Sequence, residues 1–267
     1  MKILILSNKD IASNFALNLL IPKLKDEHQL HLWLSAKVGK STNQPEQLLR
    51  LKFFEQDLLN KLLSRSFNNN QTNKFTGFEG FEFHLDSEIK DENTINSSES
   101  IDRIQRLAPD LIISIRYGCI LKDKCIEIPK HGVINLHSGI LPKYRGVMAT
   151  FWAMLKGDTT IGTTLHKIND GTIDTGEIIK ISTMAVQSEK SYLQHTLELY
   201  HQGTLDIIDA TMTYSRNEKI ITIPQAKSDS YFTFPKEDDF VRFEQKGFKL
   251  ITEQEYMDFL CQYYLTE

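Results

Sequence analysis

Short apolar runs and amphipathic stretches alternate along the first part of the chain. The runs at 2–6 and 30–34 predict two buried strands, and the apolar positions of 11–25 between them predict a helix. This strand–helix–strand order is how a doubly wound α/β domain begins. A G-x-G-x-x-G does not follow the first run, so a dinucleotide site loses its main support.

The next stretch mixes helical and polar signals. Leucines and phenylalanines recur every three or four positions over 48–62 behind Pro45, which predicts a helix. The Asn-rich tract 65–80 is interpreted as a mobile loop. Residues 81–85 alternate like a strand, and 101–107 form a short helix that must stop before a proline.

From residue 110 onward the strand signals are dense. Four apolar runs predict strands at 110–115, 132–137, 162–168 and 177–181, with helices at 149–156 and 193–211. The fold class expected is therefore α/β, a Rossmann-like, doubly wound and mostly parallel sheet.

The C-terminal part differs in composition. We expect a core at 1–215 and a small appendage at 216–267 that packs on the core or on a second subunit. Residues 226–267 hold five basic and nine acidic side chains and most of the late aromatic residues. These aromatic residues are expected to be core or dimer-contact residues first, and a homodimer is plausible on this basis.

Charge and cysteine usage exclude several classes. The chain has 267 residues with 31 basic and 35 acidic side chains, and a pI near 6.1 argues against a generally basic, nucleic-acid-coating surface. No apolar run reaches 18 residues, so we expect no membrane partner and a cytoplasmic location. Three cysteines without a C-x-x-C indicate neither a disulfide framework nor a metal site.

The candidate chemistry centres on Asn135 and His137. On extended backbone, a separation of two places both side chains on one face, at the edge where open α/β sheets bind ligands. Asp174, one connection further on, is the carboxylate that would fix the imidazole. An amide donor, a base and an orienting acid suit acyl transfer without an acylated side chain.

The segments INLHSGILPKYRG (134–146) and IDTG (173–176) give the family resemblance. An N-x-H, an L-P-x-Y-R-G and an I-D-T-G in this order resemble the 10-formyltetrahydrofolate-dependent formyltransferases. The resemblance implies that Asn135, His137 and Asp174 are the catalytic residues and that 10-formyltetrahydrofolate is the co-substrate, with no metal.

The same resemblance implies a pterin slot between two loops. Its backbone would read the pterin edge, while Ile120 and Leu121 cover an apolar face. The implied lining residues are Gly118, Cys119, Ile120 and Leu121 on one side and Asn169, Asp170, Gly171 and Thr172 on the other.

Two further positions are interpreted from the residues around the motif. Gly139 removes a side chain near the nucleophile's approach, which resembles the amino-sugar branch and would make room for a hexose ring. His166, on a predicted strand, is interpreted as a structural neighbour of the site.

The acceptor expected is a dTDP-linked amino-dideoxyhexose, such as dTDP-4-amino-4,6-dideoxyglucose, for a bacterial surface polysaccharide such as O-antigen. Lys143 and Arg145 would meet the diphosphate, or bridge loops instead, and Tyr231 or Phe234 would stack on the base. Transfer RNA is disfavoured because the C-terminal part is short and acidic.

Other activities stay open at this point. Glycinamide ribonucleotide or a UDP-amino-sugar would be alternative acceptors for the same transfer. A formyltetrahydrofolate hydrolase would use the same three residues with water. A non-catalytic folate-binding protein would tolerate the loss of Asn135 or Asp174.

Overall fold

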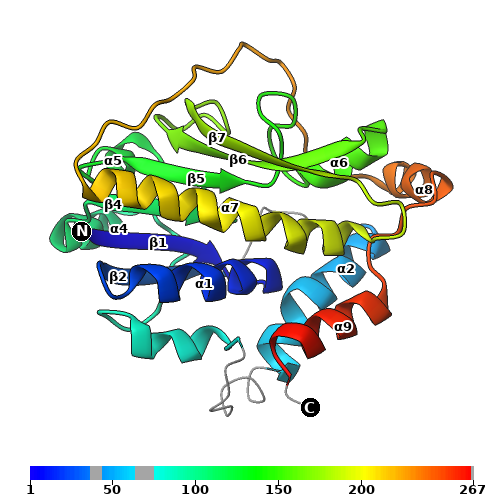
Figure 1. Cartoon of the computed structure of the whole chain (residues 1–267), viewed down its shortest axis with the longest axis horizontal. Helices are drawn as coiled ribbons and strands as arrows, with labels where there is room; N and C mark the ends of the chain where they lie inside the picture. Colours follow the sequence, from blue (N-terminus) through cyan, green and yellow to red (C-terminus); the bar gives the residue numbers. More distant parts are fainter. Residues whose placement is uncertain (37–43, 64–74, 266–267) are drawn as a thin grey trace.

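The computed structural model describes residues 1–36, 44–63 and 75–265, and a seven-stranded sheet lies at its centre (Figure 1). The strand order is β3-β2-β1-β4-β5-β6-β7. Strands β1 to β5 pair in parallel, whereas β6 is antiparallel to both β5 and β7. The strands are β1 (Lys2–Asn8), β2 (Gln29–Ser35), β3 (Lys90–Asp91), β4 (Leu111–Ile115), β5 (Val133–His137), β6 (Thr160–Ile168) and β7 (Ile178–Ala185). The predicted mostly parallel α/β sheet is confirmed.

The central strands are buried on both faces, which explains their continuous apolar runs. Ile3 to Leu6 of β1 and Leu111 to Ile113 of β4 are fully buried. Alternate residues of each strand belong to two cores, one on each side of the sheet. Each short apolar strand therefore contributes side chains to both hydrophobic cores.

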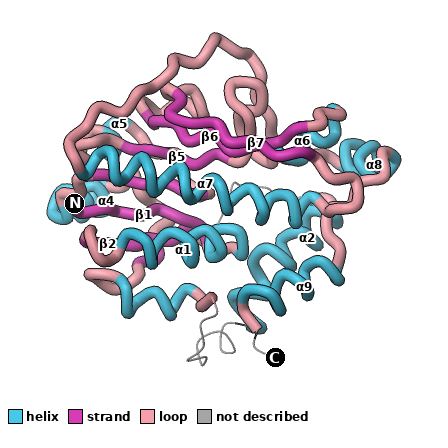
Figure 2. Tube along the Cα trace, in the orientation of Figure 1, coloured by secondary structure: helices cyan, strands magenta, loops and turns pink. Residues whose placement is uncertain are grey.

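Helices cover both faces (Figure 2). Helices α1 (Ile11–Leu24) and α7 (Tyr192–Ser215) lie side by side on one face, while α4 (Ser98–Leu107) and α5 (Asp123–Ile126) pack on the other. Gly203 lies inside α7, where a Cβ would come within 2.8 Å of Leu136 on β5. The glycine therefore allows the helix to lie close to the strand that carries Asn135.

Four helical segments gather on the side to which β1 and β5 point (Figure 1). They are α2 (Glu46–Lys52), α6 (Ala149–Lys156), α8 (Glu237–Gln245) and α9 (Glu253–Tyr263). A π-helical segment, η1 (Phe53–Leu63), continues α2. Together they surround the carboxyl edge of the parallel strands, which is where such sheets place ligands.

The strand predicted at 81–85 is wrong. Residues Phe78–His84 form a 3-10 helix, η2, in which Phe81 is buried and Phe83 is 91% exposed. The alternation of phenylalanine and polar residues therefore does not reflect two faces of a sheet. Most of the Asn-rich tract interpreted as a loop, residues 65–74, lies outside the described residues.

The aromatic residues of the C-terminal segment pack on the core of this chain. Phe243 of α8 stacks on Phe151 with ring centroids 4.5 Å apart. The Tyr264 hydroxyl donates to Asn14 Oδ1 at 2.7 Å, which ties the segment to α1. Several of these aromatic residues are core residues, one of the two roles expected for them, although Tyr231 is exposed. The dimer contact and the proposed division at residues 215 and 216 stay predictions.

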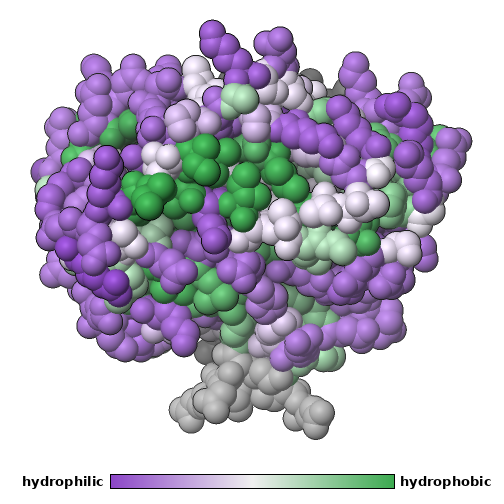
Figure 3. All heavy atoms as spheres, turned by 45° about the horizontal axis from the view of Figure 1, so that its top comes forward, coloured by the Kyte–Doolittle hydropathy of each residue, from purple (hydrophilic) through white to green (hydrophobic). Residues whose placement is uncertain are grey.

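The surface is mainly hydrophilic, with an apolar area on the face shown in Figure 3. Exposed apolar side chains include Ile181, Leu205, Ile221 and Ile223. Within the described residues, no helix combines the length and apolarity needed to cross a bilayer. Among the same residues, no group of three or more His, Cys, Asp or Glu side chains is arranged to hold a metal ion.

Candidate active site

Asn135 and His137 lie on the same face of β5, at its carboxyl end. Leu136 between them points into the core on the opposite face, as alternation along a strand requires. His137 is 8% exposed, and Asn135 is half-buried. The predicted placement of the two side chains on one face is confirmed.

Asp174 comes to the same place from the loop that follows β6. Its Oδ2 lies 3.5 Å from Nδ1 of His137 and accepts a hydrogen bond from the backbone N–H of Gly146 at 2.9 Å. Its backbone adopts a left-handed φ of 54°, and the side chain is 9% exposed. The structure therefore brings together the three residues that the sequence singled out.

Both ring nitrogens of His137 have acceptor partners. Nε2 lies 2.6 Å from the carbonyl oxygen of Tyr144, and Nδ1 faces the Asp174 carboxylate. Each ring nitrogen that carries hydrogen can therefore donate to one of them. These contacts fix the orientation of the ring at the end of β5.

The Asp174 carboxylate stays ionised in this setting. Burial alone would raise its pKa, but the facing His137 ring and the Gly146 N–H hold the pKa of Asp174 well below its usual range. A buried anion beside an imidazole is the arrangement that stabilises an imidazolium.

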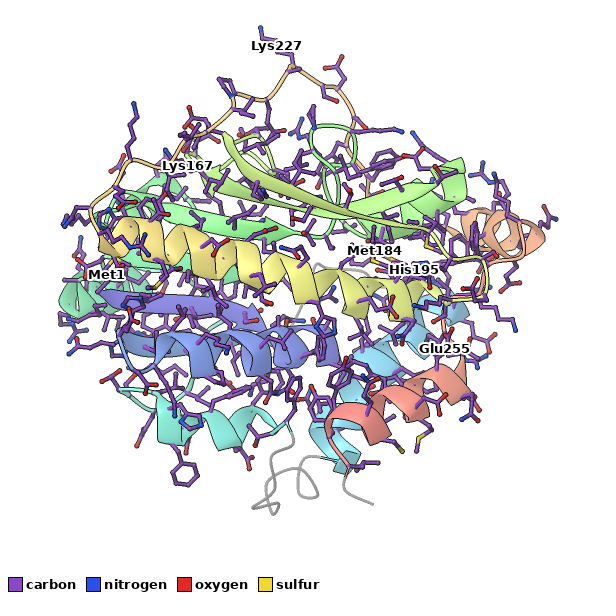
Figure 4. All side chains as sticks on the ribbon, in the orientation of Figure 1. Met1, Lys167, Met184, His195, Lys227 and Glu255 are labelled. Carbon is purple, nitrogen blue, oxygen red and sulfur yellow. The ribbon has the colours of Figure 1, made fainter. Side chains whose placement is uncertain are left out.

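A second histidine completes the cluster. His166 of β6 lies with Nε2 3.1 Å from Asn135 Nδ2 and 3.5 Å from Asp174 Oδ1. The other ring nitrogen, Nδ1, lies 2.8 Å from the carbonyl oxygen of Lys167, and the label of Lys167 in Figure 4 shows where in the fold this end of β6 lies. The interpretation of His166 as a structural neighbour is confirmed, but its contacts with two of the three candidate catalytic residues were not foreseen.

The segment before α6 is tied to the Asp174 loop by Arg145. The guanidinium donates to the carbonyl oxygen of Ile173 at 2.9 and 3.0 Å and to that of Ser228 at 3.0 Å. Phe232 adds backbone hydrogen bonds to Arg145 and Val147 on either side of Gly146. A Cβ at Gly146, whose φ is 96°, would lie 2.1 Å from Phe232 O.

A glutamine from the same segment also holds the Asp174 loop. Gln225 Nε2 donates to the carbonyl oxygen of Asp174 at 3.1 Å and to that of Gly176 at 2.6 Å. The role of Gln225 could not be predicted from the sequence, because no motif marks it and its partners lie about 50 positions earlier in the chain. The C-terminal segment therefore positions the site.

The expectation that Gly139 leaves room for a hexose ring is wrong. A Cβ at this position would lie 2.4 Å from the Ala149 Cβ and 2.7 Å from Nε2 of His137. The space is thus already filled by protein atoms. Gly139 permits close packing of α6 and the imidazole against the strand end.

The two loops expected to line a pterin slot approach each other. Gly171 faces the carbonyl oxygen of Leu121, which would lie 3.7 Å from a Cβ there. The Gly118 N–H is held by Ser35, the Ile120 carbonyl by Asn96, and Asp170 accepts from the Thr172 N–H. Neither loop, 117–122 or 169–176, contains a helix or strand, and Lys122 is the N-cap of α5. The backbone groups of both loops are therefore not paired in regular secondary structure.

Side chains in the first loop differ in their availability. Leu121 is 3% exposed and packs in the core beside α5, whereas Ile120 is 53% exposed. Of the two residues expected to cover an apolar face, only Ile120 is free to do so. Burial raises the pKa of the Cys119 thiol, which disfavours its use as a nucleophile.

The residues expected at the acceptor are spread along the outer part of the site. Lys143 forms an exposed ion pair with Asp158 at 2.6 Å. Tyr231 is 48% exposed, and Phe234 lines a cavity of about 470 Å³ together with Pro45 and Leu48 of the α2 region. Arg145 does not line this cavity, and its guanidinium is engaged by the carbonyl groups of Ile173 and Ser228.

Comparison with known proteins identifies the family. The sequence profile of the formyl transferase family matches residues 64–210, which include Asn135, His137 and Asp174. This chain belongs to the formyl transferase family. The resemblance drawn from the N-x-H and I-D-T-G motifs is therefore confirmed.

Curated methionyl-tRNA formyltransferases match part of this chain. The one from Geobacter sulfurreducens is 42% identical over 85 residues, which cover 32% of this chain and 26% of that protein. The one from Thermodesulfovibrio yellowstonii is 34% identical over 151 residues, or 57% and 46% of the two chains. The matches thus span about half or less of these relatives.

Solved formyl transferase structures share the fold. An N-formyltransferase from Helicobacter canadensis, complexed with folinic acid and dTDP-3-aminofucose, superposes with a TM-score of 0.58 at 18% identity, covering 96% of this chain and 82% of that one. Glycinamide ribonucleotide transformylase 1 from Symbiobacterium toebii gives 0.57 at 12% identity, covering 85% and 94%. At these identities the likeness shows the fold alone.

Proposed function

We propose that this formyl transferase moves the formyl group of 10-formyltetrahydrofolate to the amine of a dTDP-linked amino-dideoxyhexose. The observation that carries the transfer chemistry is the convergence of Asn135, His137 and Asp174 at the end of β5. The Helicobacter canadensis protein of the same fold is described with folinic acid and a dTDP-amino-sugar, which supports the choice of ligands.

The chain offers a suitable place for the folate. The facing loops around Leu121 and Gly171 are irregular backbone beside the exposed Ile120 side chain, and the Leu121 carbonyl oxygen faces Gly171. A pterin ring needs such a polar edge and an apolar contact. We propose that the eight loop residues named in the sequence analysis line this slot.

The proposed mechanism is direct transfer. Bound 10-formyltetrahydrofolate supplies the formyl group. The neutral sugar amine attacks the formyl carbon, and an Asn135 N–H donates to the carbonyl oxygen as negative charge develops there. His137, held by Asp174, takes the proton that the amine loses, with Nε2 exchanging its Tyr144 carbonyl partner for the reacting groups. The proton passes to the leaving folate nitrogen as the bond between this nitrogen and the formyl carbon breaks.

The acceptor would extend from His137 toward α2 and α8. The cavity is lined by the Phe234 ring, on which a thymine could stack, and by three charged side chains, those of Lys236, Glu237 and Asp238. Tyr231 is an exposed second aromatic residue nearby in the chain. Lys143 and Arg145 stay predictions as diphosphate ligands, because a diphosphate has to compete with their present carboxylate and carbonyl partners.

Methionyl-tRNA is the second candidate acceptor. The curated relatives carry that name and favour it. Against it, residues 226–267 have a charge balance of five basic to nine acidic groups and fold onto the core. A surface that binds a phosphate backbone needs more basic than acidic groups.

A homodimer, a cytoplasmic location and a surface-polysaccharide pathway such as O-antigen synthesis remain parts of the proposal.

The test is an end-point assay with 10-formyltetrahydrofolate and a panel of acceptors. The panel contains dTDP-4-amino-4,6-dideoxyglucose, dTDP-3-amino-3,6-dideoxyglucose, UDP-4-amino-4-deoxyarabinose, glycinamide ribonucleotide and methionyl-tRNA. We expect mass spectrometry to detect one added formyl group on a dTDP-sugar. The product should be absent with His137→Ala and present with His131→Ala, a matched change at a partly buried histidine before β5.

Other outcomes would contradict the proposal. Formylation of methionyl-tRNA or glycinamide ribonucleotide alone would replace the acceptor. Release of formate without any formylated acceptor would indicate a hydrolase. No turnover with any acceptor, together with folate binding, would indicate a binding protein.

A further inference from the structure

The cluster contains a buried group that the proposed mechanism does not use. His166 is 1% exposed and lies directly opposite Asn135 in the antiparallel pair of β5 and β6. Directly opposed residues of such a pair carry their side chains on the same side of the sheet. The register of β6 against β7 is irregular between Leu165 and His166. Irregularities of this kind re-aim side chains next to active sites.

The partners of His166 define its protons. Nδ1 lies 2.8 Å from the carbonyl oxygen of Lys167, which can only accept, so Nδ1 carries hydrogen. The nearest partner of Nε2 is the Asn135 amide nitrogen at 3.1 Å, a donor, and the Asp174 oxygen is further away at 3.5 Å. A neutral ring with a free lone pair on Nε2 fits this arrangement.

We propose that His166 is a positioning residue for formyl transfer. Its Nε2 accepts one N–H of Asn135 and thereby fixes the orientation of the carboxamide. Because the amide group is planar, fixing one N–H also fixes the other, which is left to face the reacting oxygen beside His137. This inference rests on the proposed function and adds a residue to it.

The glycine of the I-D-T-G motif supports the same assignment. A Cβ at Gly176 would lie 1.8 Å from the Lys167 carbonyl oxygen, the atom that receives the Nδ1 proton of His166. A side chain there would displace this acceptor and release the ring. Gly176 therefore preserves the tautomer that can accept from Asn135.

Loss of His166 would act on the reaction through Asn135. Without His166 as acceptor, the Asn135 carboxamide can rotate by 180°, which would present Oδ1 instead of an N–H to the developing negative charge. A misplaced donor of this kind raises the barrier of the chemical step and leaves binding of the ground state nearly unchanged.

The first experiment separates kcat from KM. We expect His166→Met, which keeps bulk but removes the acceptor, to lower kcat roughly 10- to 100-fold and to change both KM values by no more than about twofold. His166→Gln, whose amide oxygen can accept from Asn135, should recover most of the rate. The matched control is His195→Met. His195 is a buried histidine on α7 that bonds the backbone of Ser191 and Gln187, and it is well separated from Lys167 in Figure 4.

The second experiment needs no turnover. With ¹⁵N-labelled histidine, NMR should report His166 as a neutral ring protonated at Nδ1 and accepting a hydrogen bond at Nε2. The chain has eight histidines, and the His166→Gln variant assigns this one. The Gly176→Ala variant should shift this signal, because its side chain displaces the Lys167 carbonyl.

The outcomes distinguish this inference from the proposed function. An unchanged kcat in His166→Met, an equal loss in His195→Met, or a protonated Nε2 would each overturn the positioning role. If the wild-type protein formylates none of the acceptors, the proposed function fails, while the NMR result still decides the state of His166.

Discussion

Two carboxylates near the ends of the parallel strands, the buried Asp174 and the partly buried Glu55, have opposite electrostatic surroundings. Asp174 is faced by two imidazole rings and one backbone N–H. Glu55 shares a single guanidinium with Asp10. Arg116 donates from Nε to both Asp10 oxygens at 2.9 and 3.0 Å and from Nη2 to Glu55 at 3.2 Å.

The pKa values of the two groups shift in opposite directions as a result. The pKa of Asp174 lies well below its usual range despite its burial. Burial raises the pKa of Glu55 to about 7, because Arg116 compensates it only in part and Asp10 adds a like charge. The number of donors available to each carboxylate, and not burial alone, decides its ionisation.

The largest effect is expected from Asp174→Asn. This change keeps the shape of the side chain but removes the charge that stabilises the His137 imidazolium. By analogy with the same substitution in a Ser-His-Asp triad, kcat should fall roughly 10³- to 10⁴-fold. Formylated product per unit time measures the loss.

Asp206→Asn is the matched control for that prediction. Asp206 is a buried carboxylate of α7 that accepts hydrogen bonds from Ser182 and Gln202, away from the site. Its variant should retain kcat within about twofold. A loss smaller than tenfold in Asp174→Asn would mean that His137 does not depend on this carboxylate.

Much of this site could be predicted from sequence because its parts are local. The spacing of Asn135 and His137 on one apolar run places them on one face, and I-D-T-G marks the loop of Asp174. The contacts of His166 depend on the register of β6 against β5. That register is set across a connection of 22 residues containing α6, and no local turn signal encodes it.

The fold was predictable where strands are long and apolar. The two-residue strand β3 is exposed and contains no apolar residue. Residues 81–85 mislead for the opposite reason, since their alternation is as regular as that of a real strand. In residues 81–85 only Phe81 packs in the core, while Phe83 is exposed to solvent, so tertiary packing overrides the strand-like alternation.

The second-largest effect should follow from Arg116→Met, which leaves Asp10 and Glu55 without their shared cation. Removing one partner of a buried ion pair typically costs about 3–5 kcal/mol, and urea unfolding at pH 7 should show a loss of that size. Arg50→Met, in the exposed pair with Glu253, should change stability by less than about 1 kcal/mol. Equal effects of the two variants would mean that Arg116 is not needed to compensate the two carboxylates.

The smallest and most specific effect concerns the pH dependence of stability. The pKa of Glu55 is raised from 4.5 to about 7 on folding, so the folded protein binds more protons than the unfolded chain between these values. Stability contributed by this group is therefore fully present below pH 4.5 and is lost as the pH rises to about 7, with a slope of at most about 1.4 kcal/mol per pH unit.

Glu55→Gln should remove this component of the slope, because the amide does not titrate. Urea unfolding of the wild-type protein and the variant at pH 5, 6, 7 and 8 measures the difference, which should grow between pH 5 and 7 and level off above. Glu253→Gln, at an exposed site, should run parallel to the wild type. If Glu55→Gln also runs parallel, Glu55 is ionised throughout, and Arg116 compensates its two carboxylates as fully as His137 and the Gly146 N–H compensate Asp174.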